Sequence, residues 1–185
     1  NGIVKGRGCA DGRLQREFIS KEEASSPTVS LYALILTCLI AAGEGCCVAT
    51  VDLPGAFLQT MMPKDEEPVH VKIFGPMAEL MIQEYPHLAE FAITTRKGTK
   101  IVYARANKAI YGTLKAALLF WQKLSGKLQE WGFEANDYYD SCTMNKIIKG
   151  KQATIVWHVD DLMISHENQS VIDDIIKDME EEYGK

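Results

Sequence analysis

Three stretches of the chain have the apolar patterns of helices. The first, over residues 27–42, follows Ser26, whose hydroxyl can cap a helix, and we expect it to be a buried helix. Residues 116–131 repeat apolar side chains every three or four positions and predict an amphipathic helix. A third helix is expected from Ser170, paired as a cap with Asp173.

Other stretches have the short, β-branched character of strands. We expect strands at 47–52, 69–73 and 101–104, and a hairpin over 155–164 with Asp160 and Asp161 at its tip. We also expect a helix at 78–84 and a turn at 94–100. This order predicts an α+β fold, with helices on one face of a sheet.

Length and composition are those of an ordinary globular domain. The chain has 185 residues, of which 46% are hydrophobic and 24% charged, enough for one domain with a sizeable core. Five cysteines without CxxC spacing predict reduced, buried thiols and an intracellular, not secreted, protein. The apolar run 31–42 is too short to cross a bilayer, so we expect no membrane partner.

The charge is unevenly distributed along the chain. The net charge is −5, but residues 91–129 contain eight basic residues and no acidic one. Such segregation allows a basic surface that meets phosphates. A helix with a solvated lysine face explains the stretch 115–127 equally well.

Two acidic positions suggest chemistry. Asp160 and Asp161 are adjacent in an apolar hairpin, where a solvated turn is the ordinary interpretation. Asp52, however, ends another apolar strand and is followed by the turn pair Pro54-Gly55. If the two strands are neighbours, three carboxylates converge and could hold two cations about 4 Å apart for phosphoryl transfer.

Five segments of the chain match the sequence blocks of one protein family. Residues 51–58, VDLPGAFL, resemble the block D-x-x-x-A-F-L, and His158-Val159-Asp160-Asp161 resembles the Y-V-D-D box. Three further segments are similar to blocks of the same family: residues 108–121 to K-A-x-Y-G-L-K-Q-A-P-x-x-W, residues 132–140 to G-F-x-x-S-x-x-D, and residues 5–12 to K-A-R-L-V-A-x-G. The chain thus resembles the reverse transcriptase domain of copia-type long-terminal-repeat retrotransposons, and the resemblance spans nearly all of it. His158 replaces the usual Tyr, and the middle block is one residue longer than usual before Trp121.

The resemblance implies the fold of a right-hand polymerase, with an antiparallel palm sheet backed by helices. Residues 1–25 and 60–110 would be fingers-like, and residues 26–59 and 111–185 palm-like, with thumb and ribonuclease H absent. We expect the chain to be a piece of a Pol polyprotein whose integrase and ribonuclease H are other domains. It would act in a cytoplasmic virus-like particle or in the nucleus.

The resemblance also implies RNA-directed DNA polymerase activity and a set of site residues. Two Mg²⁺ ions, with Mn²⁺ as a substitute, would serve transfer from a deoxynucleoside triphosphate (dNTP) to a primer on an RNA or DNA template. The implied metal ligands are Asp52, Asp160, Asp161 and the backbone of Leu53, with the three aspartates as catalytic residues. The implied dNTP contacts are Ala56, Phe57, Tyr111, Gly112 and either Lys5 or Arg7, and the implied template and primer contacts are Lys115 and His158.

Two other functions remain open from the sequence. A catalytically inactive or repurposed remnant would keep the fold and bind nucleic acid in a salt-sensitive way without magnesium-dependent chemistry. An unrelated two-metal phosphohydrolase would use the same carboxylates, but it would need neither the basic segment 5–12 nor an aromatic gate at Phe57.

Overall fold

The computed structural model describes residue 6, residues 8–136 and residues 139–184. The strands and α-helices follow in this order: α1 (Lys21–Ala24), α2 (Leu31–Gly43), β1 (Cys47–Asp52), β2 (His70–Phe74), α3 (Pro76–Glu84), β3 (Ile93–Thr94), β4 (Lys100–Arg105), α4 (Ala116–Glu130), β5 (Glu134–Asn136), β6 (Asp140–Ile148), β7 (Lys151–His158), β8 (Asp161–His166) and α5 (Gln169–Tyr183). Short 3-10 helices span Gly12–Glu17, Ala56–Gln59 and Pro86–Phe91.

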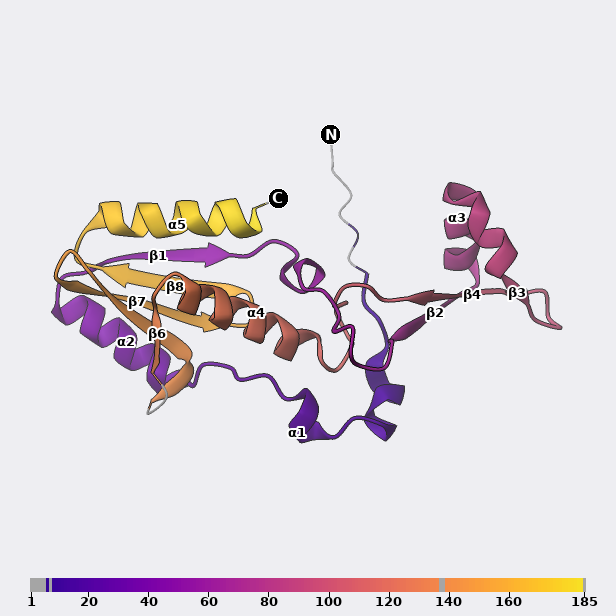
Figure 1. Ribbon diagram of the computed structural model, residues 1–185, viewed down its shortest axis with the longest axis horizontal. Helices are drawn as coiled ribbons and strands as arrows, with labels where there is room; N and C mark the ends of the chain where they lie inside the picture. Colours follow the sequence, from indigo (N-terminus) through magenta and orange to yellow (C-terminus); the bar gives the residue numbers. More distant parts are fainter. Residues whose placement is uncertain (1–5, 7, 137–138, 185) are drawn as a thin grey trace.

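The strands form two antiparallel sheets. The five-stranded sheet has the order β1-β8-β7-β6-β5 and, with α2, α4 and α5, makes up what we call the body. The three-stranded sheet has the order β2-β4-β3 and, with α3 and the 3-10 helix Pro86–Phe91, makes up the arm. Figure 1 shows the arm projecting from the end of the body toward which β1 points.

The main core lies between the large sheet and helices α4 and α5. Phe120 and Leu124 of α4 and Ile175 of α5 pack in one buried cluster with Trp157 of β7 and Ile164 of β8. Each fully buried side chain of this size contributes roughly 1.5–3 kcal/mol from removal of apolar surface from water. This face of the sheet therefore provides most of the stability of the body.

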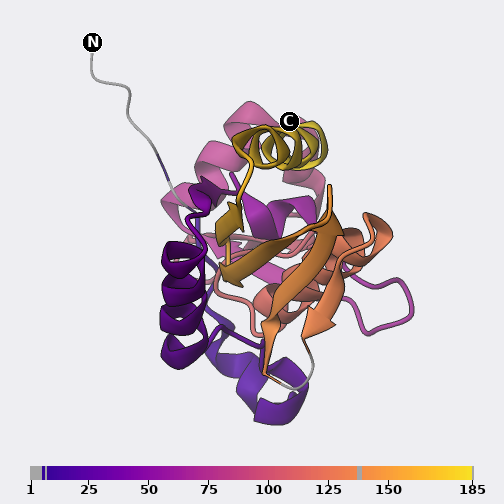
Figure 2. The same cartoon turned by 90° about the vertical axis from the view of Figure 1, so that its left-hand side faces the viewer.

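Helix α2 covers the opposite face of the large sheet. Cys38 Sγ of α2 lies 3.8 Å from Met163 Sδ, and Met163 alternates in β8 with the core residues Leu162 and Ile164. Figure 2 shows α2 beside the orange strands and α5 above them. The expectation of helices on one face only is therefore wrong.

Helix α2 is also less buried than its composition predicted. Only Ala33, Thr37 and Ala41 are buried, because these small residues face the sheet, while Leu31, Tyr32, Ile35, Leu36, Leu39 and Ile40 are exposed. The helix begins at Leu31, capped by Ser30, and not at Pro27. The backbone amide of Ser30 donates to Asp140 Oδ2 at 2.9 Å, which fixes this helix end to β6.

Several local expectations are confirmed and others need correction. β1 and α4 lie where their patterns placed them. The cap of α5 is Asn168, whose Oδ1 accepts from the Ser170 amide at 2.9 Å, so the expected Ser170–Asp173 cap is wrong. All five cysteines are free thiols, but only Cys142 is buried. No helix in the described ranges is long and apolar enough to span a membrane.

Candidate functional site

The ends of β1 and of the β7–β8 hairpin meet at one edge of the body. Asp52, the last residue of β1, is the direct partner of Asp161, the first residue of β8. One residue further, the Leu53 amide donates to the carbonyl oxygen of Asp160 at 3.1 Å. The structure thus brings Asp52, Asp160 and Asp161 to the same sheet edge, as the sequence predicted.

Three polar residues form a row across the strands at this edge. His158 of β7 pairs with Asp161 of β8, which pairs in turn with Asp52 of β1. Directly paired residues of antiparallel strands share a face, so all three belong to the face covered by α2. They border an open hollow of about 550 Å³, whose other side is formed by Val29, Leu34 and Cys38. A substrate can therefore reach the row from solvent.

The hairpin that carries Asp160 and Asp161 has an unusual turn. Only Val159 and Asp160 lie between the paired residues His158 and Asp161. Val159 has φ +60°, in the left-handed region that β-branched residues rarely adopt. Such a conformation costs about 1–3 kcal/mol and persists only where the surroundings enforce it. Here the Leu53–Asp160 hydrogen bond and the packing of Val159 against the core supply that constraint.

Opposed carboxylates at Asp52 and Asp161 are electrostatically unfavourable unless a cation lies near them. Mg²⁺ is commonly held by one or two carboxylates together with water and substrate phosphates. The Asp52–Asp161 pair fits such an ion. In the described part of the chain, however, no three His, Cys, Asp or Glu side chains are grouped as ligands of one metal ion. The three residues share an edge without forming a complete ligand set.

The segment after β1 is held by contacts that the sequence did not reveal. Gly55 has φ +62° and starts the 3-10 helix Ala56–Gln59. Gln59 Nε2 donates to the carbonyls of Pro54 at 2.8 Å and Tyr183 at 2.7 Å, and Lys123 Nζ donates to the Gln59 carbonyl at 3.1 Å. Gln59 therefore anchors the turn beside Asp52 to the end of α5.

The aromatic residue expected at the dNTP pocket is part of the core. Phe57 is only 9% exposed, and its ring centroid lies 4.4 Å from that of Tyr111 and 6.1 Å from that of Phe120. Ala56 beside it is fully buried. Phe57 and Tyr111, from separate sequence blocks, thus lie together in the cluster that contains Leu53, the residue after Asp52, and their contact with a nucleotide stays a prediction.

Gly112 has a structural role that explains its identity. Its φ of +90° favours glycine, and a Cβ at this position would collide with the carbonyl oxygen of Ala10 and with Cys9 Sγ. The Ala10 amide donates to the carbonyl of Tyr111 at 2.7 Å. The N-terminal segment therefore crosses the Tyr111–Gly112 turn in direct backbone contact.

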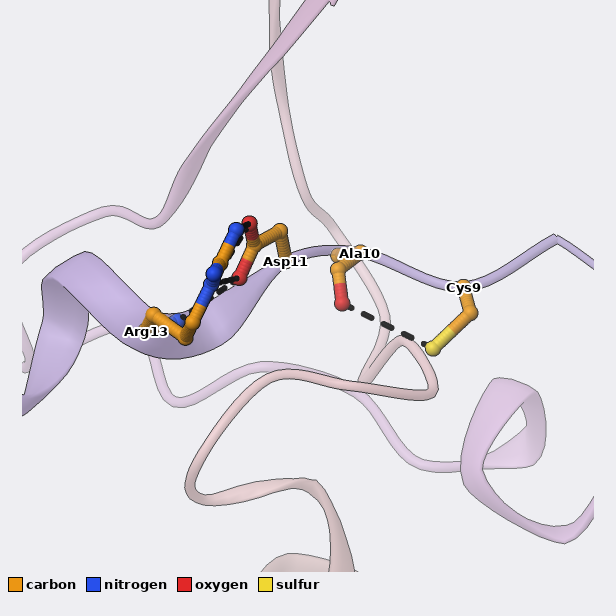
Figure 3. Close-up of polar contacts among 4 residues, drawn as sticks. All are labelled: Cys9, Ala10, Asp11 and Arg13. Carbon is orange, nitrogen blue, oxygen red and sulfur yellow. Dashed lines mark hydrogen bonds and ion pairs between the residues drawn. The ribbon is translucent and has the colours of Figure 1, made fainter.

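The same N-terminal segment continues into a local ion pair. Figure 3 shows Asp11 and Arg13 side by side, with Arg13 Nη2 2.7 Å from Asp11 Oδ2, and the Cys9 thiol directed to the Ala10 carbonyl. The hydrogen bonds from Arg13 lower the pKa of Asp11 to about 2. The side chain of Asp11 is therefore engaged with Arg13 and remains ionised well below neutral pH.

Four further residues were predicted to contact the substrates. Lys115 Nζ forms a 2.7 Å ion pair with Glu66 at the base of the arm, so a template phosphate would compete with that carboxylate. His158 is exposed beside Asp161. Lys5 and Arg7 lie outside the described residues. The proposed roles of these four residues stay predictions.

Comparison with known proteins agrees with the sequence blocks. The family model described as reverse transcriptase (RNA-dependent DNA polymerase) matches residues 1–184. Searches of curated proteins and of solved structures returned no match. Because the family model covers almost the whole chain, including the strands that carry Asp52, Asp160 and Asp161, the chain belongs to the reverse transcriptase (RNA-dependent DNA polymerase) family.

Proposed function

We propose that this chain is the RNA-directed DNA polymerase domain of a copia-type retrotransposon. The observation that supports this most directly is the pairing of Asp52 with Asp161, together with the hydrogen bond between Leu53 and Asp160. These contacts join two distant sequence blocks at one accessible sheet edge. The body would then correspond to the palm, and the arm with the N-terminal segment to the fingers.

The reaction would be nucleotidyl transfer to a primer. The primer 3′ oxygen forms a bond to the α-phosphorus of the dNTP, the bond between the α-phosphorus and its bridging oxygen breaks, and pyrophosphate leaves; the 3′ hydroxyl proton passes to water. Asp52, Asp160, Asp161 and the Leu53 carbonyl would hold two Mg²⁺ ions. When bound, these ions activate the hydroxyl and neutralise the leaving phosphates.

Side chains near this edge would bind the dNTP and the primer. Phe57 and Tyr111 would pack beneath the sugar and favour deoxynucleotides, and their mutual stacking would hold the ring of Phe57 in place. Lys5 or Arg7 would bind the triphosphate, since the segment that follows them crosses the Tyr111–Gly112 turn. His158 would face the primer end, beside Asp161.

Magnesium-dependent dNTP incorporation on a primed RNA template tests the proposal. We expect Asp52→Asn and Asp160→Asn to lower the rate by at least about 10²-fold, the scale of losing one transition-state partner. Asp173→Asn is the matched control, because Asp173 is exposed on α5 away from the edge and should leave the rate unchanged. Incorporation that survives Asp160→Asn would overturn the assignment.

A second candidate is a nucleic-acid-binding remnant without catalysis. It is favoured by one observation, that no three metal-ligating side chains are grouped in the ranges the structure describes. It predicts salt-sensitive binding of primer-template by the wild-type chain and no incorporation with either Mg²⁺ or Mn²⁺. The wild-type incorporation assay therefore separates the two candidates.

A further inference from the structure

The sheet of the arm has one covered face and one open face. Helix α3 packs on one side, where Ala78 of α3 and Val102 of β4 are buried, and Figure 1 shows α3 on that side of the strands. The strand register pairs His70 with Arg105, Lys72 with Tyr103 and Phe74 with Ile101. Paired residues share a face, so these six lie on the side opposite Val102 and its partner Ile73, together with Ile93 of β3, the partner of Ile101. We call them the open face.

The open face carries positive charge, although Glu66 and Glu67 border the same hollow as His70 at one end of it. It contains Lys72 and Arg105 together with His70, and no acidic residue. Within the described ranges, neither Lys72 nor Arg105 forms an ion pair. Arg96 and Lys97 extend the basic character into the turn between β3 and β4. A polyanion would relieve the repulsion among these groups, so the charge complements a phosphate backbone.

The same face presents two exposed aromatic rings. Phe74 is 62% exposed and Tyr103 is 51% exposed, and they are diagonal neighbours on adjacent strands. Lys72 Nζ lies 5.8 Å from the centre of the Phe74 ring. Exposed aromatic rings set among cations on a sheet are the arrangement on which the bases of single-stranded nucleic acids stack. A surface for an apolar protein partner would not need the two unpaired cations.

We propose that the open face of the arm binds single-stranded nucleic acid, with bases stacked on Phe74 and Tyr103 and phosphates bound by Lys72 and Arg105. The assignment of that strand as unpaired template rests on the proposed function, because the arm projects from the sheet end where β1 terminates in Asp52 (Figure 1). The binding itself requires only the arm.

Fluorescence anisotropy with a labelled 12-nucleotide oligo(U), in buffer with chelator and no divalent cation, measures this binding in the whole chain. From the stacking energy per base, we expect Tyr103→Ala and Phe74→Ala each to weaken binding roughly 5- to 150-fold. Replacing Lys72 and Arg105 together by Ala should lower the slope of log affinity against log salt by about 1.4. The matched controls are Tyr85→Ala, which removes a 57% exposed ring outside the open face, and Lys177→Ala on α5.

The outcomes separate this proposal from the polymerase assignment. If wild type incorporates dNTP, Asp160→Asn does not, and Tyr103→Ala weakens oligo(U) binding, both proposals stand. If wild type does not incorporate dNTP but Tyr103→Ala weakens oligo(U) binding, only the open-face proposal stands. Unchanged binding by Tyr103→Ala, with an unchanged thermal melt, would overturn it. So would a change in self-association without a change in oligo(U) affinity, because the face would then be a protein interface.

Discussion

The body and the arm are both antiparallel sheets with helices packed on them, yet they bury their side chains very differently. In the body, residues Ile155, Trp157, Leu162 and Ile164 of adjacent strands are almost completely buried between α4 and α5. In the arm, from His70 to Arg105, only Ala78 and Val102 are buried. A small sheet with so little buried apolar surface is marginal alone, so the arm depends on its attachment to the body.

The difference teaches where stability and recognition are located. The body holds the carboxylate edge on strands fixed by a dense core, which suits chemistry that needs fixed geometry. The arm exposes aromatic and basic side chains to solvent, and as a result it buries little apolar surface. Elements of low local stability that carry exposed polar and aromatic groups are those that ordering by a ligand affects most.

The largest expected effect comes from matched core truncations in the two regions. Trp157 in the body and Val102 in the arm are each 1% exposed. We expect Trp157→Ala to lower the free energy of unfolding of the whole chain by about 3–5 kcal/mol. Val102→Ala should cost only about 1–2 kcal/mol, and only locally. Urea denaturation and amide hydrogen exchange measure both effects.

Amide hydrogen exchange shows whether the effect of a core truncation stays within the arm. Val102→Ala should speed exchange in β2, β3 and β4 and leave β6 to β8 unchanged. Equal acceleration in the large sheet would show that arm and body unfold as one cooperative unit and do not differ in local stability.

Gly112 lies beyond the base of the arm, where the N-terminal segment joins the body, and its substitution should have the next largest effect. Ala at this position must keep φ near +90° and would place its Cβ against the Ala10 carbonyl. We expect Gly112→Ala to cost about 2–4 kcal/mol and to release residues 8–12 to proteolysis. Urea denaturation and limited proteolysis test both expectations.

Gly126→Ala is the matched control for this substitution. Gly126 lies inside α4, and a Cβ there would meet no atom within 4 Å, so the same change should stabilise the chain by about 0.5–1 kcal/mol. Loss of stability in both variants would contradict the steric account of Gly112.

The sequence predicted the elements whose patterns are set locally. β1 is an apolar run that ends at Asp52 and Pro54, and α4 has clear helical spacing, so both were placed well. β6 was missed because it mixes polar and apolar residues. Its Thr143 is 3% exposed although polar, since it lies on the face under α2. Such burial is decided by tertiary packing and leaves no local pattern.

The approach of the three aspartates was predictable from the sequence, but their pairing was not. Sequence blocks indicated that Asp52, Asp160 and Asp161 share one edge, but strand register decides that Asp161, not Asp160, is opposite Asp52. Gln59 could not be found, because its role depends on carbonyl groups of Pro54 and Tyr183. Backbone contacts between distant segments have no sequence pattern.

The buried thiol of Cys142 makes the folding stability of the body depend on pH. Burial raises its pKa from 9.0 to about 11. Below pH 9 the thiol is protonated in both states; above pH 9 the unfolded chain releases this proton first. Folding stability should therefore fall by about 2–3 kcal/mol between pH 9 and 11 on account of this group. Burial also raises the pKa of Tyr183, which acts in the same direction at higher pH.

Urea denaturation of wild type and Cys142→Ala across this pH range isolates the contribution of the thiol. The variant loses packing at every pH, but its stability should fall less steeply from pH 9 to 11. Cys38→Ala, at an exposed position on α2, should keep the wild-type slope. Identical slopes for wild type and Cys142→Ala would show that this thiol is not protected in the folded body.

The smallest expected effect concerns the turn that carries Asp160. In an ordinary strand, a Gly variant is less stable to unfolding than the Ala variant by about 0.5–1 kcal/mol. We therefore expect Val48→Gly in β1 to be less stable than Val48→Ala. At Val159, with φ +60°, the order should reverse, and Val159→Gly should be more stable than Val159→Ala by about 1 kcal/mol. Urea midpoints of the four variants measure this. If Val159→Gly is the less stable member of its pair, the turn stores no backbone strain, and the carboxylate edge would be held by strand pairing alone.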